Sequence, residues 1–229
     1  MKGIIFDMDG VLIDSAEAHY HAWRTLGEEI GTPHTREFFA STFGMHNNQI
    51  MPRWLGPNLT DEESRLLAER KETLFLQVVE QHLKALPGAE HFVAAAREAG
   101  FLCAVGSSGP RRNVETALDL LGMRQLFHHL TTGDDVTEGK PHPEVFLKAA
   151  AGLGLPPSRT VVIEDAPQGV QAGLAAGCGV IALITSRPAA DLRGAHLTER
   201  NLAGLTLGQV DDLLQSLAKQ PSGSRPALA

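Results

Sequence analysis

The chain has 229 residues, which suits one large domain or a core with a smaller inserted domain. Its net charge is −7 and its lysines and arginines are scattered, so the sequence offers no basic surface for a nucleic-acid partner. No apolar run approaches the ~18 residues that span a membrane, and no leader precedes the first predicted strand, so we expect a cytoplasmic protein with no membrane partner.

The amino-terminal segment is a short apolar run that ends in two acids. Gly3 to Phe6 is continuously apolar, which is typical of a strand buried on both faces of a parallel sheet. Asp7 and Asp9 follow at the carboxyl end of this strand, where open α/β sheets bind their ligands. Gly10 indicates a sharp turn there. The pair alone also fits a polar turn, so its function depends on residues further along the chain.

A helix is expected next, from its N-cap at Ser15 to about Ile30. Its helical spacing places His19, Trp23 and Leu26 on one apolar face, together with Ile30. His19 therefore faces inward, one turn from the Asp loop. By position alone it fits either a hydrogen-bonded core histidine or a functional one.

Residues 35–86 are expected to remain helical, with no strand among them. The longest helix of this stretch begins at Thr60, with Glu63 at the capping-box position. Lys71 falls within its apolar face. The pattern leaves two interpretations open, because this side chain can either extend its ammonium to water or project into a cleft that holds an anion.

From residue 87 onward, predicted strands and helices alternate, which is typical of a parallel sheet with crossover helices. The later strands are predicted at residues 101–105, 129–132, 160–163 and 179–184. We therefore predict an α/β fold with a Rossmann-like parallel sheet core, residues 1–14 and 87–229, and an inserted α-helical cap, residues 15–86. Residues 220–229 are predicted to be a frayed tail.

Polar residues follow the ends of these later strands too. Ser107 and Ser108 follow one strand, Glu164 and Asp165 follow another, and Lys140 lies in a stiff loop with two prolines close by. Together with the first acid pair they supply what phosphoryl transfer needs, namely a carboxylate nucleophile, oxygen ligands for Mg²⁺, a hydroxyl and a fixed cation.

These segments resemble the haloacid dehalogenase-like superfamily, specifically its β-phosphoglucomutase-like branch with a helical cap after the first strand. The resemblance covers the chain from Gly3 to about Ile184. It rests on four motifs, which are Asp7-Met8-Asp9-Gly10-Val11, Ser107, Lys140-Pro141-His142-Pro143 and Glu164-Asp165-Ala166-Pro167-Gln168-Gly169.

The resemblance implies catalytic roles for four residues. Asp7 would attack phosphorus and become an aspartyl phosphate, while Asp9 would protonate the leaving oxygen and then activate water. Ser107 and Lys140 would hold the phosphoryl oxygens. It also implies a Mg²⁺ site formed by Asp7, Asp9 through its backbone carbonyl, Glu164 and Asp165.

The resemblance further implies substrate contacts in and near the cap, from His19, Lys71, Asn47 and Ser108. Mutases of this branch have an arginine where Asn47 stands, and that arginine holds the second phosphate of a bisphosphorylated intermediate. Arg53 lies further along the chain, and its spacing is wrong for a simple replacement.

We therefore expect a monomeric, Mg²⁺-dependent phosphatase that hydrolyses a small phosphate ester, a sugar phosphate. The alternative is a β-phosphoglucomutase, which must hold a phosphate at each end of its substrate. A module that only binds phosphorylated metabolites is a further alternative, but binding alone has no use for Asp9. Attack at carbon, as in a dehalogenase, needs no such acid either.

Overall fold

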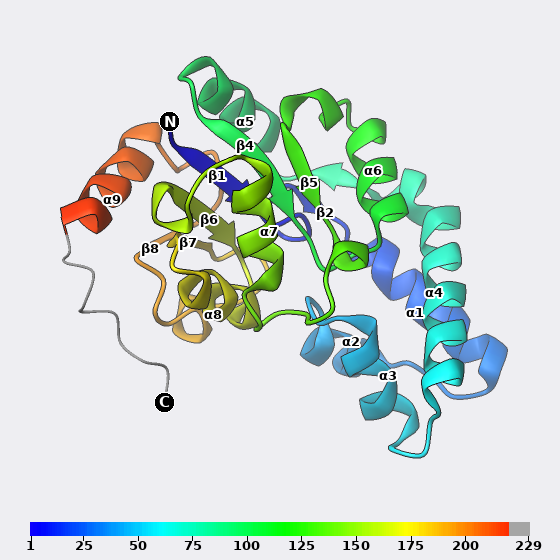
Figure 1. Ribbon diagram of the computed structural model, residues 1–229. Helices are drawn as coiled ribbons and strands as arrows, with labels where there is room; N and C mark the ends of the chain where they lie inside the picture. Colours follow the sequence, from blue (N-terminus) through cyan, green and yellow to red (C-terminus); the bar gives the residue numbers. More distant parts are fainter. Residues whose placement is uncertain (220–229) are drawn as a thin grey trace.

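The core of the protein is a parallel sheet with β1 near its centre. The structure is a computed structural model that describes residues 1–219, and within them the sheet has six strands in the order β5-β4-β1-β6-β7-β8 (Figure 1). The strands are β1 (Gly3–Phe6), β4 (Leu102–Gly106), β5 (His129–Thr131), β6 (Thr160–Glu164), β7 (Gly179–Leu183) and β8 (Leu197–Glu199). β1 pairs in parallel with β4 and with β6. The predicted α/β fold with a Rossmann-like sheet is confirmed.

Helices cover both faces of the sheet. One face packs against α5 (Ala89–Glu98), α6 (Arg111–Leu120) and α9 (Leu207–Lys219). The other packs against α7 (Glu144–Gly152) and α8 (Pro167–Ala176). Within β1, Ile4 and Phe6 belong to the first apolar cluster and Ile5 to the second. Because both faces of β1 are buried, apolar residues are needed at successive positions and not only at alternate ones. The continuous run Gly-Ile-Ile-Phe meets this requirement.

The inserted cap is a bundle of helices with its own apolar cluster. Its helices are α1 (Ala16–Ile30), α2 (Arg36–Thr42), α3 (Asn47–Leu55) and α4 (Asp61–His82). Trp23 and Leu26 of α1 pack with Phe75 of α4 in that cluster. The predicted capping box forms, because Thr60 accepts a hydrogen bond from the backbone N–H of Glu63 and donates its own backbone N–H to the Glu63 carboxylate.

A short antiparallel ribbon connects the core and the cap. Its strands are β2 (Ile13–Asp14), where the chain leaves the core, and β3 (Lys84–Ala85), where it returns. The expectation of no strand among residues 35–86 is therefore wrong, since a strand of two residues is too short to produce an alternating pattern. The ribbon places the cap beside the carboxyl end of β1.

Three further details qualify the sequence-based expectations. Ile30, expected on the inward face of α1, is 36% exposed, because it is the last residue of the helix. β8 was not expected from the sequence and adds an edge strand beside β7. The tail predicted for residues 220–229 lies outside the described residues.

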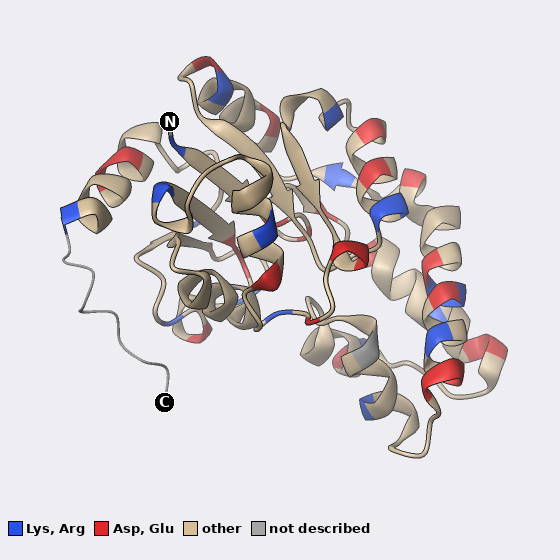
Figure 2. Ribbon diagram, in the orientation of Figure 1, with Lys and Arg blue, Asp and Glu red and all other residues tan. Residues whose placement is uncertain are grey.

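Charged side chains are mixed over the described part of the chain. Figure 2 shows lysine and arginine interspersed with aspartate and glutamate along α4 and across the core. Within residues 1–219 the basic residues are thus spread over several elements in this view. None of the helices in that range is long and apolar enough to cross a membrane.

His34 is a buried histidine in the aromatic part of the cap. Its ring stacks on Trp23 at a centroid distance of 4.9 Å and meets Trp54 and Phe38 edge to face. Neither ring nitrogen of this residue has a hydrogen-bond partner. Burial, with a smaller contribution from Lys71, lowers the pKa of His34 to about 4.

We expect this histidine to reduce the stability of the protein as the pH falls. Below pH ~6.5 the unfolded chain binds a proton at His34 that the folded protein does not, so the free energy of unfolding decreases down to pH ~4, by on the order of 3 kcal/mol. Replacing His34 with Phe should make the fall over that pH interval shallower, as measured by urea denaturation. The exposed His91, replaced with Phe, is the matched control. A variant at position 34 with the wild-type pH dependence would contradict the prediction.

Candidate active site

The Asp loop leaves β1 at the carboxyl edge of the sheet, as expected for a ligand site in an open α/β fold. The backbone N–H of Asp7 donates to the carbonyl of Ile163 at 2.9 Å, which continues the pairing of β1 with β6. Gly10 has φ +81°, and a Cβ at this position would lie 1.9 Å from Oδ2 of Asp165. Only glycine therefore allows the loop to turn this close to the second acidic segment.

Three buried carboxylates meet at this edge. Oxygen atoms of Asp7, Glu164 and Asp165 all lie within 4.8 Å of one another. Glu164 packs against Gly169 as closely as Asp165 packs against Gly10, since a Cβ on Gly169 would lie 1.6 Å from Oε1 of Glu164. Its other oxygen accepts hydrogen bonds from the backbone N–H groups of Asp165 at 2.7 Å and Ala166 at 2.9 Å. The carboxylate of Glu164 is thus held in place by hydrogen bonds from the backbone.

Lys140 supplies the positive charge of this cluster. Its ammonium is buried, donates to Glu164 at 2.7 Å and contacts the carboxylate of Asp7. Burial acts to lower the pKa of Lys140, but the two carboxylates outweigh it and raise the pKa. This lysine therefore remains charged and points at the carboxylate of Asp7.

The cluster has more negative than positive charge. Burial raises the pKa of Asp7 to about 7, with Lys140 opposing the rise and Glu164 and Asp9 adding to it. Burial and the neighbouring Glu164 and Asp7 carboxylates likewise raise the pKa of Asp165 well above its ordinary value. A divalent cation removes this repulsion, and carboxylate oxygens are the ligands Mg²⁺ prefers. The residues present therefore fit the metal site that the sequence suggests.

Asp9 lies two residues away in a different environment. Its carboxylate accepts a hydrogen bond from the Ser15 hydroxyl and lies 3.4 Å from Nε2 of His19, instead of joining the three-carboxylate group. Burial acts to raise the pKa of Asp9, but His19 and Ser15 outweigh it and leave the pKa below its ordinary value. Ser15 occupies the N-cap position of α1 as expected, but its side chain makes no capping hydrogen bond because it binds Asp9.

The predicted serines lie across the loop from these acids. Ser107 is buried at the end of β4 and accepts a hydrogen bond at its Oγ from the backbone N–H of Gly109 at 3.0 Å. Its backbone N–H donates to the carbonyl of Thr131 at 3.0 Å. Ser107 and Ser108 both line the cavity that contains Asp7 and Lys140. The strand ends thus bring every predicted core residue to one place.

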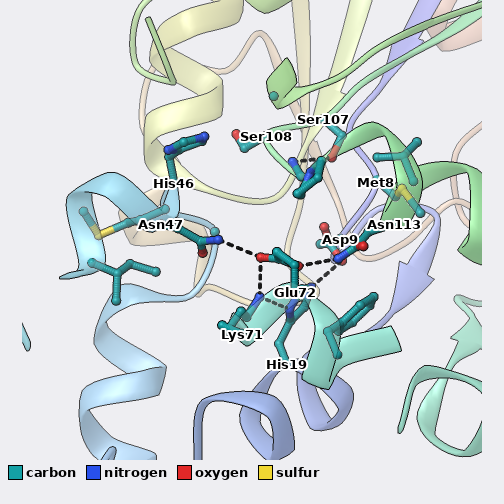
Figure 3. A pocket seen from close by; sticks show the side chains of 18 of the residues that line it. Met8, Asp9, His19, His46, Asn47, Lys71, Glu72, Ser107, Ser108 and Asn113 are labelled. Atoms are coloured by element: carbon teal, nitrogen blue, oxygen red, sulfur yellow. Dashed lines mark hydrogen bonds and ion pairs between the residues drawn. The ribbon is translucent and has the colours of Figure 1, made fainter. Parts of the chain in front are cut away.

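That cavity extends between the core and the cap and has a volume of about 530 Å³. Such a volume suits a small-molecule ligand. The cap residues His19, Lys71 and Asn47 also line it (Figure 3). Arg53, in contrast, is exposed and is not among the described residues that line the cavity.

Lys71 projects into the cavity and does not extend to water. Its ammonium donates to Nδ1 of His19 at 2.8 Å and pairs with Glu72 at 2.9 Å. Because an ammonium can only donate, Nδ1 of His19 accepts and Nε2 carries the hydrogen that faces Asp9. The ring of His19 stacks on Phe75 at 4.2 Å, which fixes its orientation. Both side chains therefore lie at the cavity wall, and their contact with substrate stays a prediction.

Sequence reasoning missed two polar residues of the cavity, Glu72 and Asn113. Glu72 accepts hydrogen bonds from Asn47 of α3 and from Asn113 of α6 (Figure 3). In the sequence Glu72 is one of many charged residues on a helix, and Asn113 lies in the first turn of another. Nothing local distinguishes them, because their contact requires the cap to lie against the core.

Known proteins share this architecture. A family model described as haloacid dehalogenase-like hydrolase matches residues 1–177. Hexitol phosphatase A of Escherichia coli strain K12 is 32% identical over 225 residues, which cover 97% of this chain and 96% of that protein. β-Phosphoglucomutase of Bacillus subtilis strain 168 is 29% identical over 214 residues, which cover 90% and 92%. A crystal structure of β-phosphoglucomutase from Clostridium difficile matches with a TM-score of 0.85 and 25% identity, and covers 96% of this chain and 100% of that one.

We expect Mg²⁺ to stabilise the folded protein, since a ligand that binds only the native state raises its stability. At a hundred times its dissociation constant the gain is about 2.7 kcal/mol, or about 5 to 10 °C in Tm, as measured by calorimetric unfolding with and without a chelator. The Asp165→Asn variant should lose most of this response. Without metal at neutral pH it should be at least as stable as the wild type, because it lacks a repelled carboxylate.

The exposed Asp212 of α9, replaced with Asn, is the control for this measurement and should respond to Mg²⁺ as the wild type does. An equal rise in Tm for the Asp165 variant would show that the cation binds elsewhere.

Proposed function

The chain belongs to the haloacid dehalogenase-like hydrolases, and within that family we propose that it is a Mg²⁺-dependent phosphatase of a small sugar or polyol phosphate, acting through an aspartyl phosphate. The observation that carries this proposal is the contrast between two aspartates on one loop. Asp7 lies in a crowded acidic cluster beside Lys140, whereas Asp9 is held apart by Ser15 and His19. These different surroundings suit the two carboxyl groups to different roles, Asp7 to attack on phosphorus beside the ammonium of Lys140 and Asp9 to proton transfer outside the acidic cluster.

In the first step a carboxylate oxygen of Asp7 attacks phosphorus, and the bond from phosphorus to the ester oxygen breaks. Asp9 gives its proton to that leaving oxygen, so the alcohol departs neutral. The negatively charged phosphoryl group beside Asp9 opposes the lowering of its pKa and favours the protonated form. Lys140 and Ser107 hold the phosphoryl oxygens.

In the second step water attacks phosphorus of the aspartyl phosphate, and Asp9, now a carboxylate, takes a proton from that water. Inorganic phosphate leaves and the carboxylate of Asp7 is restored. Mg²⁺ held by Asp7, Glu164, Asp165 and the backbone carbonyl of Asp9 would neutralise the carboxylates and the phosphoryl charge. One residue thus serves as acid first and as base afterwards.

Hydrolysis is favoured over phosphoryl return to the sugar by the residue at position 47. A mutase must hold a phosphate at each end of its substrate, and the arginine that does so in its branch is replaced by Asn47, which donates to Glu72 at 2.6 Å. The similarity to a hexitol phosphatase along 97% of the chain supports a polyol or sugar phosphate as substrate.

Replacing Asp7 with Asn should abolish turnover of phosphate esters. The amide retains the shape of the side chain but is a poor nucleophile, so we expect a loss of roughly 10⁴-fold or more in kcat. Phosphate release from a panel of phosphorylated sugars and polyols, with Mg²⁺ present, is the measurement. Asp212→Asn serves again as the control.

Retention of full activity by the Asp7 variant would refute the mechanism. Absence of turnover by the wild type on the whole panel, with phosphate binding retained, would instead favour the alternative of a module that only binds phosphorylated metabolites.

The products formed from β-glucose 1-phosphate separate a phosphatase from the alternative, a β-phosphoglucomutase. With a trace of glucose 1,6-bisphosphate added, we expect inorganic phosphate and no accumulation of glucose 6-phosphate, because the cavity lacks the arginine that holds a second phosphate in the mutases. Phosphorus NMR resolves both products. Formation of glucose 6-phosphate at a rate above that of phosphate release would establish the mutase.

A further inference from the structure

The cavity contains an acidic side chain that the proposed chemistry does not use. Glu72 of α4 is only 14% exposed in its side chain. Its Oε1 accepts hydrogen bonds from Asn47 at 2.6 Å and from Lys71 at 2.9 Å, and its Oε2 accepts one from Asn113 (Figure 3). The three donors come from two cap helices and from α6 of the core. A charge held this firmly at a cavity wall has a defined position toward any ligand.

Glu72 still has hydrogen-bonding capacity. An ionised carboxylate offers about four lone-pair positions, and three are occupied by the described donors. The remaining position on Oε2 can accept a hydrogen bond from a ligand. The ammonium of Lys71, 2.9 Å from the same carboxylate, would repel a cationic donor. A hydroxyl is therefore the donor that fits.

Glu72 belongs to the cap wall of the cavity and is connected to Asp9 through two other side chains. Starting at Asp9, the contacts run to His19 at 3.4 Å, from His19 to Lys71 at 2.8 Å, and from Lys71 to Glu72 at 2.9 Å. Asp7 of the core and Glu72 of the cap line the same cavity, so a substrate with its phosphorus at Asp7 can contact Glu72 with another part of the molecule. Burial acts to raise the pKa of Glu72, but Lys71, His19 and Asn47 outweigh it, so the pKa is lowered and the side chain is ionised at neutral pH.

We propose that Glu72 determines substrate specificity, accepting a hydroxyl at the end of the substrate remote from the phosphate and excluding substrates with a second phosphate there. The proposal rests on the proposed function, because it places the reacting phosphoryl group at Asp7. A buried carboxylate beside a phosphate is a like-charge contact with little water between, so it costs more than the same contact at the surface.

Two arginines at the cavity wall, Arg112 and Arg65, also bear on this balance. Arg112 lines the cavity beside Asn113 and could attract a second phosphate. Its side chain is exposed, however, so water and salt screen its charge. Arg65, also at the cavity wall, is already paired with Glu62 and Glu69. Among the described residues at the cap wall of the cavity, Lys71 and Glu72 are thus the charged side chains that are buried, and they form an ion pair.

The test compares three six-carbon compounds, which are glucose 6-phosphate, sorbitol 6-phosphate and glucose 1,6-bisphosphate. We expect the wild type to have a kcat/KM at least about tenfold higher for a monophosphate than for the bisphosphate. Glu72→Gln should reduce that ratio about tenfold, mainly through a lower KM for the bisphosphate, since Lys71 is then left to attract it. Glu72→Asp, which retains the charge, should preserve the preference.

The matched control is Glu80→Gln, which removes the same charge from an exposed position of the same helix and should leave the ratio unchanged. Thermal unfolding shows whether each variant is folded. A folded Glu72→Gln protein with the wild-type ratio would overturn the proposal. So would a ratio that changes only on replacement of Arg112 with Gln.

Binding measured by calorimetry on the Asp7→Asn background separates this proposal from the proposed function. Preference for a monophosphate in Asp7→Asn that is lost in the double variant with Glu72→Gln supports the specificity role, even if the wild type shows no turnover. Absence of turnover together with this binding preference would refute the proposed phosphatase activity and still support Glu72 as the residue that determines specificity. Equal affinity of Asp7→Asn for all three compounds, or affinity for none of them, would overturn the proposal for Glu72. Turnover by the wild type decides separately whether the protein is a phosphatase.

Discussion

The site depends on the repulsion among three buried carboxylates and on the single ammonium that partly offsets it. Lys140 contacts both Asp7 and Glu164, while Asp165 has Ser186 as a hydroxyl donor and no lysine of its own. Such a group is costly to bury unless charge is balanced. The sheet holds it together nevertheless, because Glu164 ends β6 and Asp7 follows β1, and these strands are paired. The repulsion lowers the stability of the fold and favours the cation that we propose for this site.

The strand-end part of the site could be predicted because its signals are local. A continuous apolar run followed by Asp7 or by Glu164 marks a buried strand and its ligand edge without knowledge of the rest of the chain. Glu72 has no such local signal, since its contact with the core is a hydrogen bond from Asn113, which lies 41 residues later on a helix of the core. Ser15 is a second residue whose contact could not be predicted from its local sequence. It lies at the predicted N-cap position of α1, but its hydroxyl donates a hydrogen bond to Asp9 and makes none to the helix.

The two ends of the cavity differ in how their charge is arranged. At the core end Lys140 pairs with both Asp7 and Glu164, whereas at the cap end Lys71 and Glu72 neutralise each other and leave hydrogen-bonding groups on the wall. His19 connects the ends, because it accepts from Lys71 and faces Asp9 with its other nitrogen. Asp9, to which we assign proton transfer, is therefore connected through one imidazole ring to Lys71 and Glu72 at the cap wall.

The ribbon of β2 and β3 has a consequence for how such proteins diverge. The chain enters and leaves the cap through two adjacent segments, with Ile13 opposite Ala85, so the whole insertion is attached at one narrow place. Substitutions or length changes in the helices beyond it leave the strand order and the acidic edge undisturbed. A reaction common to a family can therefore be kept while the cap is remodelled for another metabolite, and a phosphatase and a mutase can be descendants of one scaffold.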